Sequence, residues 1–373
     1  MNISKKNKKQ KTTHNVSLNK TLKIFAISLV TVLIFSCSKD DDVDGTPTPE
    51  PTFEVYVAGS EYNSSGKNVA KLWKNGMAQN LSNGSENASA NSVYVSGNDV
   101  YVVGYESHGT KTVAILWKNG VAQPLTDGVT YAIVSSVFVS GTDVYVTGYE
   151  SEYNGAIRIA MLWKNGVAQP LTDGSNSAIA SSVFVSGGDV YVVGYEGNGT
   201  NTIAKLWKNE IEQSLTDGSN DAVAKSVFVS GTDVYVAGYE RNGTYIAAKL
   251  WKNGAVQPLT DGTIEASAEA VYVYKNDVYV AGYDYNDATG NSVAKLWKNG
   301  IVQDLSRGSN NTDANSVYVA GDNIYVAGYE DNGSNIVAKL WSLPTDEAGN
   351  VTGQDLSDKT AFANSVFVAQ TQD

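Results

Sequence analysis

The chain has 373 residues, a formal net charge of −12, two histidines and a single cysteine. One cysteine excludes an internal disulfide framework. The excess of acidic residues predicts a surface that repels nucleic acid and anionic lipid head groups, so we expect no DNA or RNA partner.

The first 36 residues have the pattern of a signal peptide. Several lysines and no acidic residue precede an apolar run over residues 24–36. This run is shorter than the ~20 residues that a membrane-spanning helix needs, and it has the length of a signal-peptide core. We expect a leader over 1–36 that is removed; an N-terminal anchor helix that is never cleaved is the alternative.

Cys37 follows the apolar run directly, in Ile34-Phe35-Ser36-Cys37. This segment resembles the lipobox of bacterial lipoproteins, in which the cysteine is diacylated and becomes the new N-terminus. The acidic run at 38–42 resembles the surface-export signal of Bacteroidota lipoproteins; a merely solvated linker is the alternative. The resemblance implies lipidation of Cys37 and a lipid-anchored protein of the outer membrane, displayed at the cell surface.

Residues 37–52 also carry a Pro/Thr stretch, which predicts a semi-stiff spacer between the lipid and a domain over 53–373. In that domain all seven tryptophans occupy one position of a repeat. They follow one another at intervals of 44 to 46 residues: Trp73, Trp117, Trp163, Trp207, Trp251, Trp297 and Trp341. A period in the forties with strand-like content is typical of propeller blades.

One repeat, over 181–218, shows how each blade is expected to form. Apolar strands are predicted over 182–185, 189–196 and 203–207, and a short fourth strand over 212–215. Most sister repeats have Asn-Gly before the fourth strand, which suits a type I′ turn between antiparallel strands. Both faces of these strands are apolar, so each sheet must be covered on both sides, as radial stacking of blades achieves.

The two ends of the domain predict that the ring closes. The first predicted strand, at 54–59, is a second strand of the repeat, and the last, at 364–368, is a first strand. Pairing them gives seven complete four-stranded blades without an exposed edge. The arrangement resembles the closure of WD40 and kelch-type propellers, although their signature motifs are absent. We predict an all-β, seven-bladed β-propeller and a monomer; an open solenoid is the alternative.

Few residues outside the leader could carry catalysis. His108 is the only histidine there and lies in a predicted turn, so the residues favour no triad, metal site or cofactor. Two carboxylates would suffice for glycoside hydrolysis. An acid does end the second strand of every repeat: Glu61, Glu106, Glu150, Glu196, Glu240, Asp284 and Glu330. Because a ring of equivalent acids is symmetric, it favours a repeated structural hydrogen bond over a catalytic site. Lysine precedes five of the tryptophans by two residues; Ile115 and Met161 replace it in two repeats, which indicates a packing position.

The repeats differ mainly in the crossovers between blades and in the loops between second and third strands, which in propellers emerge on one face. The crossovers contribute Tyr131, Asn176, Asp221 and Glu265, and the loops contribute Tyr153, Arg158, Arg241, Tyr245, Tyr285 and Asp287. At the entrance of the innermost strand one position reads Asn91, Ser135, Ser181, Lys225, Glu269, Asn315 and Asn364. Aromatic and hydrogen-bonding groups together suit a glycan or a peptide, and neutral variation of exposed loops is the alternative.

Three functions are compatible with this sequence. The first is a non-enzymatic surface lipoprotein that binds an extracellular carbohydrate or protein through the variable face. The second is a carboxylate-dependent glycosidase or lyase, and the third is a structural surface repeat without a ligand. The near-identical repeats favour binding over catalysis, because a catalytic site is normally asymmetric. Propellers serve all three functions.

Overall fold

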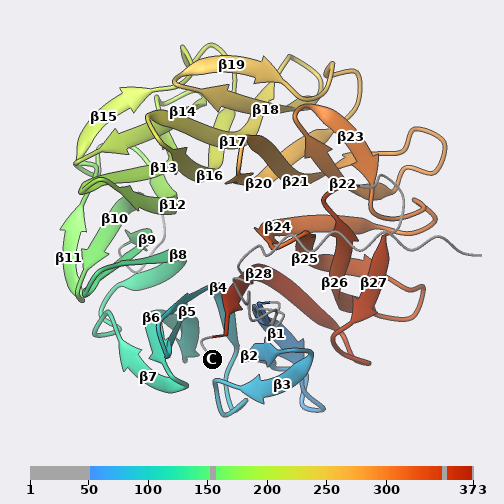
Figure 1. The fold of residues 1–373 in the computed structure, drawn as a ribbon. Helices are drawn as coiled ribbons and strands as arrows, with labels where there is room; N and C mark the ends of the chain where they lie inside the picture. The colour runs from blue at the N-terminus through green and yellow to red at the C-terminus, as the bar shows by residue number, and fades with distance from the viewer. Residues whose placement is uncertain (1–50, 152–156, 347–350, 372–373) are drawn as a thin grey trace, which may run out of the picture. The chain divides into compact units, whose positions relative to one another are not determined.

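The computed structural model describes residues 51–151, 157–346 and 351–371, and it contains seven four-stranded antiparallel sheets arranged in a ring (Figure 1). The ring belongs to a compact unit, Glu50–Asp373. Cys37, the leader and most of the linker lie outside the described residues. Within the described part of the chain, no helix is long and apolar enough to cross a membrane. The fold is the predicted seven-bladed β-propeller.

Each blade runs from an innermost to an outermost strand. Blade 1 consists of β28 (Ala361–Gln370), β1 (Phe53–Tyr62), β2 (Asn68–Lys74) and β3 (Met77–Asn80). Blade 2 has β4 (Ala88–Ser96), β5 (Asp99–His108), β6 (Lys111–Lys118) and β7 (Val121–Pro124); blade 3 has β8 (Tyr131–Ser140), β9 (Asp143–Ser151), β10 (Arg158–Lys164) and β11 (Val167–Pro170). Blade 4 has β12 (Ala178–Ser186), β13 (Asp189–Gly197), β14 (Thr202–Lys208) and β15 (Ile211–Ser214); blade 5 has β16 (Ala222–Ser230), β17 (Asp233–Arg241), β18 (Ile246–Lys252) and β19 (Ala255–Pro258). Blade 6 has β20 (Ala266–Tyr274), β21 (Asp277–Tyr285), β22 (Ser292–Lys298) and β23 (Ile301–Asp304); blade 7 has β24 (Thr312–Ala320), β25 (Asn323–Asp331), β26 (Ile336–Pro344) and β27 (Thr352–Asp355).

The innermost strands are longer than the sequence suggested. In blade 4, β12 starts at Ala178 rather than at Ser182, and its pairing with β13 passes through a bulge between Ala180 and Ser182. Gly194 lies opposite this bulge, where a Cβ atom would collide with the carbonyl oxygen of Ile179. The glycine is therefore required by close backbone approach and not by a turn.

The core lies between the blades. Trp207 of blade 4 is fully buried and packs with Val183 and Val192 of its own blade against Tyr145 and Leu162 of blade 3. Burying one such indole contributes roughly 4–6 kcal/mol of gross transfer free energy. The same packing recurs at the other interfaces, because six of the seven tryptophans are at most 1% exposed and Trp341 is 3% exposed.

The last strand closes the ring, as predicted. β28 pairs antiparallel with β1, from Phe53 opposite Gln370 to Glu61 opposite Ala361. Val366 and Val368 of β28 lie in the apolar cluster that also holds Trp73 of blade 1 and Leu340 of blade 7. Chain ends more than 300 residues apart in sequence therefore complete one sheet.

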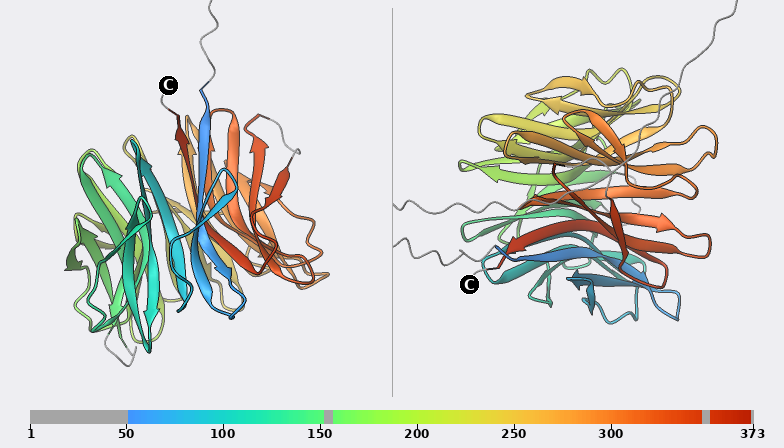
Figure 2. Two further views of the ribbon diagram at one scale, coloured as in Figure 1. Left: turned by 90° about the horizontal axis from the view of Figure 1, so that it is seen from below. Right: turned by 45° about the vertical axis from the view of Figure 1, so that its right-hand side comes forward.

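Hydrogen bonds define two faces of the ring. On the turn face, the turn between third and fourth strands is tied to the start of the second strand: Val100 N donates to Asn119 Oδ1 at 2.8 Å. On the loop face, the loops between second and third strands are tied to the crossovers: Asn198 Nδ2 donates to the Gly218 carbonyl at 3.1 Å. β1 begins and β28 ends on the same side, the turn face (Figure 2).

Candidate ligand-binding face

The turn face repeats one polar network in most blades. In blade 4, Asp189 accepts hydrogen bonds from Asn209 Nδ2 at 2.8 Å and pairs with Lys208 Nζ at 2.7 Å, and Lys208 lies over the ring of Tyr191. The lysine and asparagine lower the pKa of Asp189. Asp99, Asp143, Asp233 and Asp277 have the same partners in their own blades. A network that is repeated so uniformly fastens turns to strands, which is a structural role.

The ring of acids at the ends of the second strands is also structural, but its partner is the lysine two residues before each tryptophan. Lys205 has a side chain only 7% exposed and lies 3.7 Å from Glu196, with Glu212 on its other side. The sequence indicated a packing position for these lysines, and the structure shows that packing and ion pairing are combined. The pairs are Glu61–Lys71, Glu196–Lys205, Glu240–Lys249, Asp284–Lys295 and Glu330–Lys339.

Two blades lack this ion pair, because Ile115 and Met161 replace the lysine. In blade 3, Glu150 accepts a hydrogen bond from Thr130 Oγ1 at 3.1 Å instead. In blade 2, Glu106 lies 3.9 Å from His108 Nε2. The symmetry of the acid ring is thus broken in two neighbouring blades.

A closed ring of seven aromatic side chains lines the centre of the propeller, one from each innermost strand. Neighbouring ring centroids are 4.6 to 4.9 Å apart and the planes are tilted by 41 to 59°. The members are Tyr94, Phe138, Phe184, Phe228, Tyr272, Tyr318 and Phe367. These aromatic residues were not among the predicted site residues, although each of the seven stands between two valines of its repeat.

The predicted entrance position carries a polar side chain in all seven blades. Three of its asparagines bridge blades, as when Asn91 Nδ2 donates to the Val134 carbonyl at 2.7 Å. Lys225 and Glu269 form an ion pair across neighbouring blades at 3.3 Å, and Ser267 Oγ donates to Glu269 at 2.5 Å. Burial disfavours the charge of Lys225, but Glu269 together with the nearby Tyr239 and Tyr195 raises the pKa of Lys225 overall.

Beside this ion pair lies a second carboxylate, Asp313, which was not among the predicted site residues. Asp313 of β24 accepts a short hydrogen bond from the hydroxyl of Tyr329, and burial raises its pKa. Its other oxygen is buried and has no hydrogen-bond partner among the described residues. The phenol of Tyr283 is near both Asp313 and Glu269, and burial followed by these two charges raises its pKa. The sequence does mark Asp313 by its position in the repeat, because the other repeats have serine or an apolar residue there.

We name Lys225, Tyr239, Glu269, Asp313 and Tyr329 the mouth cluster. Lys225 Nζ lies 5.8 Å from the ring centroid of Tyr239 in the same blade, which adds this phenol to the cluster. The cluster therefore spans blades 5, 6 and 7 and holds one cation, two carboxylates in different surroundings and two phenols. Blades 3 and 4 offer only Ser135 and Ser181 at the same entrance position.

A second aromatic group lies on blade 3. Tyr131 stacks on Tyr149 with centroids 6.2 Å apart and planes 25° apart, and the Arg158 guanidinium lies 5.2 Å from the Tyr149 centroid. Burial raises the pKa of Tyr149 to about 12. The sequence predicted Tyr131 and Arg158 as ligand-binding residues, and the structure brings them onto one tyrosine.

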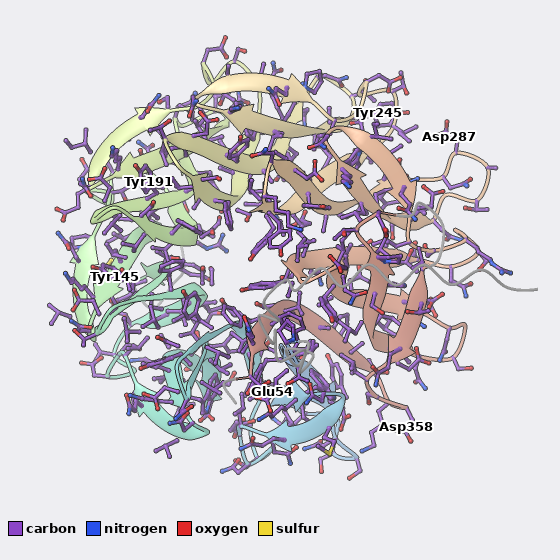
Figure 3. All side chains as sticks on the ribbon, viewed as in Figure 1. Glu54, Tyr145, Tyr191, Tyr245, Asp287 and Asp358 are labelled. Carbon is purple, nitrogen blue, oxygen red and sulfur yellow. The ribbon has the colours of Figure 1, made fainter. Side chains whose placement is uncertain are left out.

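Other predicted residues have local structural partners. Asp221 Oδ1 accepts from Thr202 N at 2.8 Å and Glu265 Oε2 accepts from Ile246 N at 3.1 Å, so both hold the start of a third strand. Arg241 donates to the Thr244 carbonyl at 2.9 Å, and Asn176 Nδ2 donates to Ser175 Oγ at 3.4 Å. Tyr245 and Asp287 lie at the periphery of the ring (Figure 3). Tyr153 lies outside the described residues.

The described residues include no group of three or more histidine, cysteine, aspartate or glutamate side chains placed to hold a metal ion. No protein-family description matches the sequence, and no curated protein matches it. The comparison with solved structures supports the fold. A puromycin-hydrolysing peptidase of Mycobacterium tuberculosis aligns at 12% identity and a TM-score of 0.55, over 81% of this chain and 51% of the peptidase. The chain therefore spans about half the length of that peptidase.

The β-propeller domain of the Trilobed protease from Pyrococcus furiosus aligns at 10% identity and a TM-score of 0.50, over 83% of this chain and 95% of that domain. That domain is described as having an open velcro topology, whereas β28 and β1 close the ring here. At such identities the similarity shows a shared propeller architecture and no shared activity.

Proposed function

We propose that this protein binds an extracellular glycan through the mouth cluster on the loop face, without cleaving it. The supporting observation is the asymmetry of this face. The framework repeats seven times, yet Lys225, Glu269 and Asp313 occur at one side of the channel entrance only. A discrete ligand needs such an asymmetric set of groups, whereas a purely structural repeat does not.

A glycan suits the chemistry of the cluster better than an apolar ligand. Phenol rings offer flat surfaces to sugar faces, and carboxylate, ammonium and amide groups offer hydrogen bonds to hydroxyl groups. The acids at the strand ends are mostly occupied by lysines, which leaves the cluster as the place where unequal carboxylates meet. A protein ligand is the competing outcome of the test.

A glycan array followed by calorimetry with the best-binding oligosaccharide tests this proposal. Replacing Lys225 with Met and Glu269 with Gln together removes the ion pair while keeping side-chain size. We expect at least a tenfold weaker affinity, because charge-assisted hydrogen bonds to the ligand are lost. Ser135→Ala, at the same entrance position in blade 3, which does not neighbour the cluster, is the matched control and should stay within twofold. A double variant that binds like the unaltered protein contradicts the proposal, and binding to proteins alone favours the protein ligand.

Catalysis is a second candidate, and one observation favours it. Asp313 has a raised pKa in a buried setting, while the neighbouring Glu269 is held by Lys225 and Ser267. Two carboxylates in different surroundings are what a glycosidase or lyase uses as acid and base. Cleavage of the bound oligosaccharide, lost in Asp313→Asn with binding retained, is the result that this candidate requires. An intact oligosaccharide after prolonged incubation contradicts it.

We further propose that the protein is exported, anchored by a lipid on Cys37 to the outer membrane at the cell surface, and monomeric. The support comes from the sequence around Cys37, together with the position of β1. The chain enters the ring on the turn face, opposite the mouth cluster. Metabolic labelling with a fatty-acid analogue should mark the protein, and Cys37→Ala should abolish the label; a label that persists in this variant rejects the anchor.

A further inference from the structure

A pocket on the loop face of blade 2 lies where the acid–lysine pattern is broken. It has a volume of about 390 Å³ and lies between the crossover from blade 1 and the loop that follows β5. Its lining includes Ser82, Glu86, Ala88, Glu106 and His108. Glu86 already pairs with Lys67 at 3.3 Å, whereas among the described side chains Glu106 has only the contact with His108.

The other blades show what Glu106 lacks. At five equivalent positions the carboxylate lies 2.8 to 4.0 Å from a lysine ammonium group. These lysine side chains are 7 to 18% exposed, so the ammonium groups are largely withdrawn from water. The fold therefore places an ammonium group beside this carboxylate in most blades and can hold it there.

In blade 2 the lysine is replaced by Ile115, which is 3% exposed and packs with Leu81 and Ala88 beneath the pocket. Glu106 lies opposite Ala88 in the strand register, with a side chain 26% exposed. The carboxylate has thus lost its internal cation, and a pocket of ligand size opens beside it. A half-desolvated carboxylate favours a charged donor over water.

We propose that this pocket binds a primary ammonium group of a ligand, which pairs with Glu106 in place of the missing lysine. Ser82 and the adjoining loop shape the pocket around the rest of the ligand. An amino sugar and a lysine side chain both present this group. The site lies in blade 2, apart from the mouth cluster, and does not depend on the glycan-binding function proposed above.

Calorimetry in 0.15 M salt distinguishes the sources, because this ionic strength screens non-specific attraction to the acidic surface. The probes are a glucosamine trisaccharide, its N-acetylated counterpart and Nα-acetyl-lysine methylamide. We expect one or both of the ammonium probes to bind and the N-acetylated trisaccharide to fail. The ammonium probe that binds more tightly identifies the source.

Two substitutions assign the binding to Glu106. Glu106→Gln removes the charge, and Ile115→Lys restores the internal ion pair found in five blades. Each should weaken binding at least tenfold, the loss expected for one charge-assisted hydrogen bond. Ile115→Met is the matched control, since methionine occupies this position in blade 3, and it should bind within twofold of the unaltered protein.

Failure of both ammonium probes overturns the proposal, as does undiminished binding by Glu106→Gln. If Ca²⁺ or Zn²⁺ displaces the probes, and Glu106→Gln weakens binding of the metal as much as binding of the probes, the pocket is a metal site and the proposal is overturned. If Ile115→Lys does not fold, Glu106→Gln decides alone. The Lys225→Met, Glu269→Gln double variant should bind the ammonium probe unchanged, so this result is separate from the fate of the mouth cluster.

Discussion

Removing the closing strand is the most direct test of the ring. Truncation after Ala363 deletes Val366 and Val368, which are 4% and 3% exposed, and Phe367 of the aromatic ring. Burial of these three side chains contributes about 5–9 kcal/mol at about 1.5–3 kcal/mol each, as an upper estimate. The truncated chain no longer loses the conformational entropy of ordering the deleted segment, which reduces the loss of stability. The truncation also exposes Val57 of β1, which increases it.

We expect a net loss of about 3–6 kcal/mol and a fall in Tm of about 10 °C. Calorimetric melting measures both, and truncation after Gln370 is the matched control, because among the described contacts it removes only the exposed one between Thr371 and Thr52. A peptide spanning residues 361–371 should restore part of the lost stability when added in excess. Equal melting of the two truncated chains refutes the reasoning that β28 closes the ring.

Four further predictions concern the repeated contacts. Lys205→Met leaves Glu196 without its cation and should lower the free energy of unfolding, measured by chemical denaturation, by about 1–3 kcal/mol. Adding Glu196→Gln should recover most of this loss. Lys164→Met, on the exposed turn face, should lower it by less than about 1 kcal/mol. Glu210 has a φ of 69° where sister turns have glycine, so Glu210→Gly should stabilise by about 1 kcal/mol; a lower midpoint contradicts this. Ala270→Ser should raise the free energy of unfolding by about 0.5–1.5 kcal/mol. The six other blades have a serine at this position, and its hydroxyl accepts a hydrogen bond from a valine N–H of the next blade. An unchanged denaturation midpoint would argue against that bond. Because lysine and asparagine lower the pKa of Asp99, Asp143, Asp189, Asp233 and Asp277, their stabilisation is complete above the ordinary aspartate pKa and is lost as the pH falls below it. Tm should therefore fall steadily below about pH 4, less so in Asp189→Asn, and a Tm that is flat over this range would rule out the linkage.

The candidate site was only partly visible in the sequence. Lys225 and Glu269 stood out because they replace asparagine or serine at a repeated position, and the structure joins them as an ion pair. Asp221 and Glu265 also stood out as variable, yet each is occupied in capping a third strand. Variation along a sequence does not distinguish a side chain that faces a ligand from one that bonds its own backbone.

Repetition, in contrast, concealed the role of the tyrosines and of the acid–lysine pairs, because a residue that recurs in every repeat looks structural. Tyr239 and Tyr329 occupy a position that is tyrosine in nearly every repeat, so the sequence suggested framework residues. In the structure Tyr239 lies beside Lys225, and Tyr329 bonds Asp313. The strand-end acids and the lysines appeared as two separate patterns. Their pairing depends on the register between second and third strands, which places Glu196 diagonally across from Lys205.

The sequence by itself determined the seven blades, the order of strands within each and the closure of the ring. These follow from local signals, namely the spacing of the tryptophans, the Asn-Gly turns and the unmatched strands at the two ends. The tertiary structure alone decided which side chains from different blades meet: the seven-membered aromatic ring, the Lys225–Glu269 pair and the pocket beside Glu106. The aromatic ring and the Lys225–Glu269 pair join residues at least 44 positions apart. The pocket joins the crossover at 82–88 with the loop at 106–109. In each case blade packing decides which side chains meet, and the local signals of the sequence do not specify it.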